Sequence, residues 1–218
     1  MTMLRFWCWI LLRKIESIIS LEFIILVLCF TFFQIELYAW DISKNKDGIK
    51  VSTRYTKESN LKEFKAEMEV NAPLNKFIII MEDVSTYPTW MHNCQEAKIL
   101  KTINKNERIT YLVNGASWIT QQRDMVIHSK IIRQPATKEI LIQLDGKPDF
   151  IPPQEDFIRV PRVKGYWRFI SINSNKTRAI YQLILEPGGS IPNWLANTTV
   201  VDTPFSTMTN LKKLAEEK

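Results

Sequence analysis

The feature that most constrains the fold is a two-residue alternation of apolar and polar side chains that recurs from residue 49 onward. In "IKVSTRYT" (49–56) and "FKAEMEV" (64–70), every second residue is apolar or β-branched. Such alternation is typical of antiparallel strands with one solvated face and one covered face. Further strands are expected at 95–103, 107–114, 123–133, 138–145, 157–161, 164–173 and 178–185, between turn-forming segments. The sequence therefore predicts a sheet of about nine strands.

Two segments follow a helical pattern instead. The stretch "APLNKFIIIMEDV" (72–84) places Pro73 at a favourable helix start and predicts a short helix that ends near Val84. Near the C-terminus, apolar residues recur at spacings of three and four. A large sheet must bury its inner face, so this long helix is expected to lie across it, with a kink at Pro204. The predicted fold class is α+β. The apolar stripe of the C-terminal helix consists of Ile191, Trp194, Leu195, Val201, Phe205, Met208, Leu211 and Leu214.

The stretch "EPGGSIPNWLAN" (186–197) joins the last strand to this helix. Gly188 and Gly189 can adopt backbone angles that turn a strand sharply, and Pro192 suits a first helical turn. Two interpretations remain open: the glycines form a hinge that lets the helix lift as a lid, or they form a passive corner.

The first forty residues differ from the rest. Basic residues precede an apolar run of 11 residues, Phe23 to Phe33, and "LYAW" places Ala39 at a plausible cleavage point. The run is shorter than the roughly 20 residues of a membrane-spanning helix. We therefore expect a signal peptide at 1–39, a mature domain at 40–218 and export to the periplasm or the extracellular space. An uncleaved membrane anchor is the alternative.

The net charge and the lack of metal-binding and catalytic motifs in the sequence limit the functions that this chain is expected to have. The formal net charge of +6 mildly favours transient contact with an anionic membrane surface, and because the charges are interspersed, a basic surface without a partner is the alternative. No basic patch is found, so no nucleic-acid partner is expected. His92 and Cys94 lie two residues apart, but no third ligand lies near them in the sequence, which disfavours a metal site. The chain has no Gly-rich phosphate loop and no His–Asp–Ser order. A monomer without cofactor, metal or catalytic residues is expected.

Several motifs together resemble the START (StAR-related lipid transfer) domain family, over about residues 40–214. They are "EPGGSIPNWLANTTVVDTPFSTMTNLKKL" (186–214), "YPTWMHNCQEAKIL" (87–100), "RDMV" (123–126) and "GYW" (165–167). The resemblance implies a helix-grip fold, in which a curved antiparallel sheet wraps on a C-terminal helix and encloses an apolar tunnel. It also implies a bacterial-type exported protein that binds, and transfers, a lipid. The alternatives are a helix-grip enzyme, such as a cyclase or hydrolase acting on an aromatic or polyketide substrate, and a binding protein whose side chains fill the cavity.

The candidate ligand-binding residues come from the strand and helix patterns. In "RDMVIHSKI", Met125 and Ile127 occupy the apolar face and Arg123 shares their parity, whereas Asp124 and Val126 are expected to face solvent. An unpaired buried guanidinium is costly, and two interpretations of Arg123 remain open. Either it pairs with a lipid head group or a water cluster in the tunnel, or it lies at the mouth of the strand and meets solvent or a distant carboxylate. The remaining candidates are Tyr111, Trp167, Trp194, Asn197, Val201 and Phe205.

Overall fold

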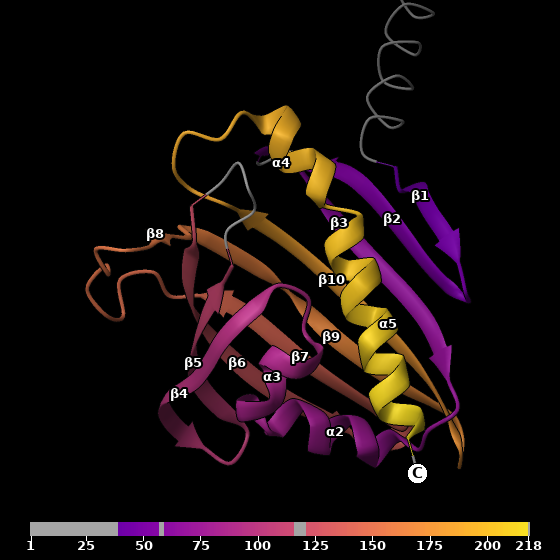
Figure 1. Ribbon diagram of the computed structural model, residues 1–218. Coiled ribbons are helices and arrows are strands. Elements are labelled where there is room, and N and C mark those ends of the chain that lie inside the picture. Colours follow the sequence, from indigo (N-terminus) through magenta and orange to yellow (C-terminus); the bar gives the residue numbers. More distant parts are fainter. Residues whose placement is uncertain (1–38, 57–58, 116–120, 218) are drawn as a thin grey trace, which may run out of the picture. The chain divides into compact units, whose positions relative to one another are not determined.

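The computed structural model describes residues 39–56, 59–115 and 121–217, and the residues from Trp40 onward form one compact unit. Within this part of the chain, ten strands form a single curved sheet (Figure 1). The order is β1-β2-β3-β10-β9-β7-β6-β5-β4, and every neighbouring pair is antiparallel, while the short β8 pairs in parallel with β6. The strands are β1 (Asp41–Lys46), β2 (Ile49–Thr56), β3 (Ser59–Val70), β4 (Cys94–Asn104), β5 (Glu107–Asn114), β6 (Arg123–Gln134), β7 (Glu139–Gly146), β8 (Ile158–Arg159), β9 (Arg162–Asn173) and β10 (Lys176–Glu186).

The helices from Leu74 onward lie on one face of this sheet, which we call the inner face (Figure 1). They are α2 (Leu74–Glu82), α3 (Tyr87–Trp90), α4 (Asn193–Thr199) and α5 (Asp202–Glu216). α5 contacts β2 and β3, and α2 contacts β9. A sheet with its C-terminal helix across one face confirms the predicted α+β architecture.

The strand predictions fail at β1, which the alternation does not reveal. All residues of "DISKNK" are exposed or half-buried, so no apolar period marks the strand. Its backbone nevertheless pairs with β2 through a tight turn at Asp47 and Gly48, where φ is 53° and 76°. Asp-Gly is a strong signal for a two-residue hairpin, so this dipeptide indicates the β1–β2 turn that the alternation does not reveal.

The C-terminal helix is interrupted rather than kinked at Pro204. α4 ends at Thr199 and α5 begins at Asp202, so Pro204 lies in the first turn of α5, where a backbone N–H is not needed. The buried face of α5 is made by Pro204, Thr207, Met208, Leu211 and Ala215.

Apolar clusters lie on both faces of the sheet. The larger one joins the inner face to the helices, and Phe77, Trp90 and Phe169 are among its fully buried members. On the opposite face, which we call the outer face, a second group is packed beneath the segment 147–157. The prediction that Val126 and Asp124 face solvent is therefore wrong, because both are buried there. This outer cluster consists of Ile109, Tyr111, Val113 and Val126, with Leu100, Ile151 and Phe157 packed against it.

Candidate functional site

A cavity of about 300 Å³ lies between the inner face of the sheet and the helices. This volume is at the lower end of the range of about 300–1,000 Å³ that is typical of small-molecule sites. Strands β3, β5, β6, β7, β9 and β10 and helices α3, α4 and α5 all contribute to its wall. The apolar part of the wall includes Leu112, Met125, Ile127, Ile142, Trp167 and Leu183.

Strand parity decides which residues line the cavity. On β5, Arg108, Thr110, Leu112 and Asn114 face inward, because successive side chains on a strand point to opposite faces. On β6 the inward residues are Arg123, Met125, Ile127 and Ser129. The antiparallel register pairs Asn114 with Arg123 and Arg108 with Ser129. Arg108 and Arg123 thus mark opposite ends of this strand pair, about 20 Å apart along the strands.

Arg123 marks the end of the cavity near α4. Its Nε donates to the carbonyl oxygen of Pro187 at 2.9 Å, and its Nη1 donates to the carbonyl oxygen of Gln121 at 2.7 Å. No described carboxylate pairs with it, and burial lowers the pKa of the Arg123 guanidinium. Within the described residues its partners are two backbone carbonyls rather than a carboxylate.

Arg108 marks the opposite end, near α2. Its Nη1 donates to the carbonyl oxygen of Glu82 at 2.9 Å, and its Nη2 donates to that of Met81 at 2.5 Å. These carbonyls belong to the last turn of α2, which carries partial negative charge. Arg108 therefore caps the C-terminus of this helix.

Aromatic side chains form a continuous stack at the cavity wall. The rings of Trp167 and Tyr181 are parallel, with centroids 3.8 Å apart, and Phe64 meets Tyr181 edge-on at 4.9 Å. Tyr87 donates its hydroxyl to the carbonyl oxygen of Met81 at 2.7 Å. Burial raises the pKa of Tyr87 to about 12 and raises that of Tyr181 as well. Both hydroxyls are therefore neutral at physiological pH.

Five of the predicted site residues line the cavity: Arg123, Met125, Ile127, Trp167 and Asn197. Asn197 also fixes α4 to the sheet, because its Oδ1 accepts a hydrogen bond from the backbone N–H of Lys62 at 3.0 Å. Three lining residues that the sequence reasoning missed are Arg108, Tyr87 and Tyr181. The alternation of Tyr181 with Ala179 and Leu183, and of Arg108 with Leu112, was the signal that could have identified two of them.

Tyr111 does not face the cavity, contrary to the prediction. It shares a face with Ile109 and Val113, as expected, but this is the outer face. The Nζ of Lys98 lies 4.8 Å from the centre of its ring, and burial together with the neighbouring Asp124 carboxylate raises the pKa of Tyr111 to about 12. Its role is to pack the outer cluster.

Three predicted helix residues are also absent from the cavity wall. Trp194 is 69% exposed, so it lies on the solvent side of α4. Val201 and Phe205 are half-buried at the edge of the inner apolar cluster, and the Nζ of Lys44 lies 4.1 Å from the centre of the Phe205 ring. Because the chain breaks between α4 and α5, the predicted apolar stripe does not continue from one helix into the other.

The glycine turn is a packed corner in this structure. Gly188 and Gly189 both have φ of 67°, a conformation that side-chain-bearing residues rarely adopt. A Cβ at Gly188 would lie 2.9 Å from the carbonyl oxygen of Arg159. A Cβ at Gly189 would lie 2.9 Å from Cδ1 of Ile158. The turn therefore rests directly on β8.

The described residues hold neither a metal-ligand cluster nor a membrane-spanning helix. Among residues 39–56, 59–115 and 121–217, no group of three or more His, Cys, Asp or Glu side chains could hold a metal ion. None of the helices described here is long and apolar enough to cross a membrane. Cys94 is a buried free thiol, and burial raises its pKa to about 11.

Comparison with known proteins places this geometry in a family. Residues 35–216 match the model of the START domain. The uncharacterized protein PA1579 of Pseudomonas aeruginosa is 34% identical over 179 residues, which cover 82% of this chain and 88% of that protein. The crystal structure of a STAR-related lipid transfer protein from Xanthomonas axonopodis has a TM-score of 0.76 and 32% identity, covering 82% of this chain and 99% of that one. Human STARD10, at 19% identity and a TM-score of 0.72 over 85% of this chain and 78% of that one, shares the fold. The chain therefore belongs to the START domain family.

Proposed function

We propose that the protein binds a hydrophobic molecule in the cavity and transfers it between membranes. The observation that carries this proposal is the cavity itself, about 300 Å³ in volume and walled mainly by apolar side chains between the sheet and the C-terminal helices. Removing apolar surface from water contributes about 25 cal/mol per Å², so an acyl chain or a similar group gains substantial affinity there. The Xanthomonas relative, which is named as a lipid transfer protein, supports the same reading.

Entry and release require part of the wall to move, and we assign this movement to α4. Short flanking segments connect this helix: the glycine turn on one side and the break at Val200–Val201 on the other. The Asn197–Lys62 hydrogen bond ties it to β3. A helix between two breaks can lift while α5 keeps its buried face on the sheet.

The setting of this activity is proposed from the leader sequence and the surface. Export, with residues 1–39 removed, brings a carrier to the space outside the inner membrane, and a monomer is sufficient because one chain forms the cavity. The exposed Trp194 on α4 suits transient contact with a membrane surface, since tryptophan favours the interface. The net charge of +6 favours anionic surfaces.

The two tyrosine hydroxyls at the cavity wall do not favour a catalytic role. A general acid or base works best with a pKa near the operating pH. Burial moves the pKa of Tyr87 to about 12 and also raises that of Tyr181, away from neutrality. We therefore propose a carrier rather than a cyclase or hydrolase.

The test is to purify the chain, extract bound molecules for mass spectrometry and measure transfer of a fluorescent phospholipid between vesicles. Ile142→Trp adds bulk inside the cavity, and Ile172→Trp adds the same bulk at a side chain that is 44% exposed on β9. We expect the first variant to lose both the co-purified molecule and the transfer activity, and the second to retain them. A wild-type chain that carries no apolar molecule and transfers no phospholipid contradicts the proposal.

A further inference from the structure

The cavity wall carries charge of one sign only. Among the described lining residues there is no aspartate and no glutamate, whereas Lys62, Arg108 and Arg123 are cationic. A buried or half-buried cation normally has a carboxylate partner, because desolvation of an unpaired charge is costly. The three cations differ in the partners that they have within the protein.

Two of them have partners that explain their presence. Arg108 donates to the carbonyls of Met81 and Glu82 at the negative end of α2, so its charge stabilises a helix terminus. Lys62 places its Nζ 5.1 Å from the centre of the Tyr55 ring, directly across the β2–β3 pair. Such a contact between a cation and an aromatic face is favourable.

Arg123 has no comparable charge partner. Its two acceptors, the carbonyls of Pro187 and Gln121, are not helix termini, and they bond two of its five N–H groups. The nearest carboxylate in sequence, Asp124, points to the outer face, where both of its oxygens bond Arg159 at 2.9 Å. Within the described residues the cavity thus has a half-buried guanidinium with unused donors and no counter-charge.

We propose that the ligand is an anionic amphiphile, with a carboxylate or phosphate group held by Arg123 at the α4 end of the cavity. This inference rests on the proposed function and specifies its ligand class. A guanidinium binds planar or tetrahedral oxyanions through two parallel hydrogen bonds, and it does so more strongly than it binds a neutral acceptor. Lys62 lies on the same side, since its backbone is bonded to Asn197 of α4, and it adds positive potential there.

The apolar body of the ligand extends from Arg123 toward α2. Between the end pairs Asn114–Arg123 and Arg108–Ser129, three of the four inward side chains of β5 and β6 are apolar, namely Leu112, Met125 and Ile127. Because Arg123 and Arg108 lie about 20 Å apart along the strands, an extended chain of about that length would span the wall from one to the other. Arg108 closes the far end with both terminal nitrogens bonded to α2.

The test compares three fluorescent probes with the same pyrene-labelled alkyl chain and different ends: a carboxylate, a phosphate monoester and a neutral methyl ester. Titration of the wild-type chain at pH 7 is expected to give at least tenfold tighter binding for one or both anionic probes than for the ester. A charge-assisted hydrogen bond accounts for roughly that factor. The carboxylate and phosphate arms identify which oxyanion the site prefers.

Arg123→Gln is expected to weaken binding of the preferred anion about tenfold and to change ester binding less than twofold. Arg123→Lys keeps the positive charge but loses the two parallel donors of the guanidinium. Its affinity for the preferred anion is expected to lie between that of the wild type and that of Arg123→Gln. Arg178→Gln is the matched control, because it removes an arginine that is 52% exposed and paired with Glu69 on the surface. We expect this control to bind all three probes like the wild type.

The outcomes separate this inference from the proposed function. If the ester and the anions bind equally well, and Arg123→Gln changes neither, the anion site is wrong while the hydrophobic carrier stands. If no probe binds, the proposed function itself fails. Unaltered ester binding in Arg123→Gln also shows that this variant is folded, so a selective loss of the anion supports the site.

Discussion

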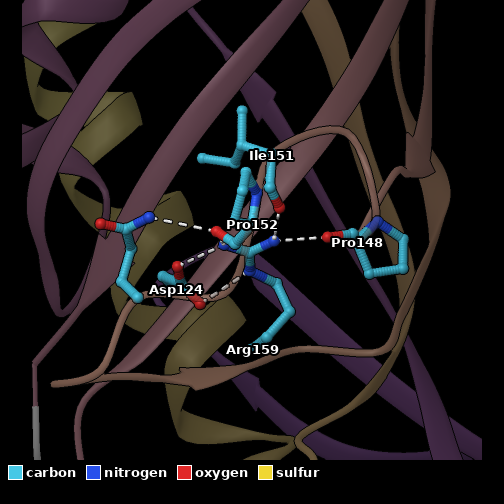
Figure 2. A network of polar contacts seen from close by, with 6 residues as sticks. Asp124, Pro148, Ile151, Pro152 and Arg159 are labelled. Carbon is cyan, nitrogen blue, oxygen red and sulfur yellow. Dashed lines mark hydrogen bonds and ion pairs between the residues drawn. The ribbon is translucent and has the colours of Figure 1, made fainter.

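Two neighbouring residues at the start of β6 show how differently the two faces of the sheet are built. On the outer face, Asp124 is fully buried and both of its oxygens bond Arg159, whose other donors reach the carbonyls of Pro148, Ile151 and Pro152 (Figure 2). On the inner face, Arg123 meets two carbonyls and a cavity. A polar network with every partner in place stabilises the fold, whereas a cation without a counter-charge beside a cavity is suited to a ligand.

The largest effect is expected from breaking the outer network. Asp124→Ala leaves the Arg159 guanidinium, whose side chain is 9% exposed, without its carboxylate. We expect the free energy of unfolding to fall by about 3–5 kcal/mol, because removing one partner strands a buried charge. Urea denaturation followed by circular dichroism measures this change.

A surface pair provides the control for this comparison. Asp145 and Lys147 also form an ion pair, but their side chains are 54% and 45% exposed. Asp145→Ala is expected to cost at most about 1 kcal/mol, because exposed pairs contribute little. Equal losses in the two variants would show that the outer network does not stabilise the fold.

An intermediate effect is expected at the glycine turn, which rests on β8 and so connects the two faces. Gly188→Ala and Gly189→Ala are each expected to introduce backbone strain of about 1–2 kcal/mol, since both positions have positive φ. The first adds a clash with the Arg159 backbone oxygen, whereas the second meets the end of the Ile158 side chain, which can rotate. We expect Gly188→Ala to be the more destabilising variant in urea denaturation, and reversed order would argue against the packed corner.

The same turn tests the hinge. If α4 lifts about this corner, Gly188→Val should slow uptake of a fluorescent phospholipid more than it lowers the equilibrium affinity, because the lost rotation acts on the opening step. Stopped-flow uptake beside equilibrium titration separates the two quantities. An uptake rate equal to that of the wild type leaves the glycines as a passive corner.

The smallest effect is expected at Trp194. From the helical stripe alone, Trp194→Ala is predicted to lower both affinity and stability, but the side chain is 69% exposed. We now expect the free energy of unfolding to change by less than about 0.5 kcal/mol, as for other surface substitutions. A loss of 2 kcal/mol or more in urea denaturation would place this ring against the protein interior.

The sequence alone predicted the strands well because one side of most strands is polar. It failed on β5, where Thr110 and Leu112 face the cavity while Ile109 and Tyr111 lie in the outer cluster. A strand that is buried on both faces has no parity signal, so Tyr111 was assigned to the wrong side. The cover on the outer face comes from residues 147–157, a contact distant in sequence that no local pattern reveals.

The helix predictions failed for a related reason. The periodic stripe treated residues 191–214 as one helix, but the chain breaks between α4 and α5, so the period does not continue from one helix into the other. Arg123, Met125 and Ile127 were placed correctly although β6 is buried on both faces at 124–127, because the half-buried His128 and the exposed Lys130 farther along the strand retain the parity signal. Local patterns therefore predicted the strand part of the cavity better than the helical part.

The most direct test of the difference between the faces is a methyl NMR titration of the chain with hexadecanoate. The reporters on the inner face are Met125, Ile127 and Ile142, which line the cavity. Those on the outer face are Ile109, Val113 and Val126, which belong to the outer cluster. We predict that saturating hexadecanoate shifts the inner methyl signals and leaves the outer ones in place. Shifts confined to the outer reporters would contradict the assignment of the inner face as the binding site.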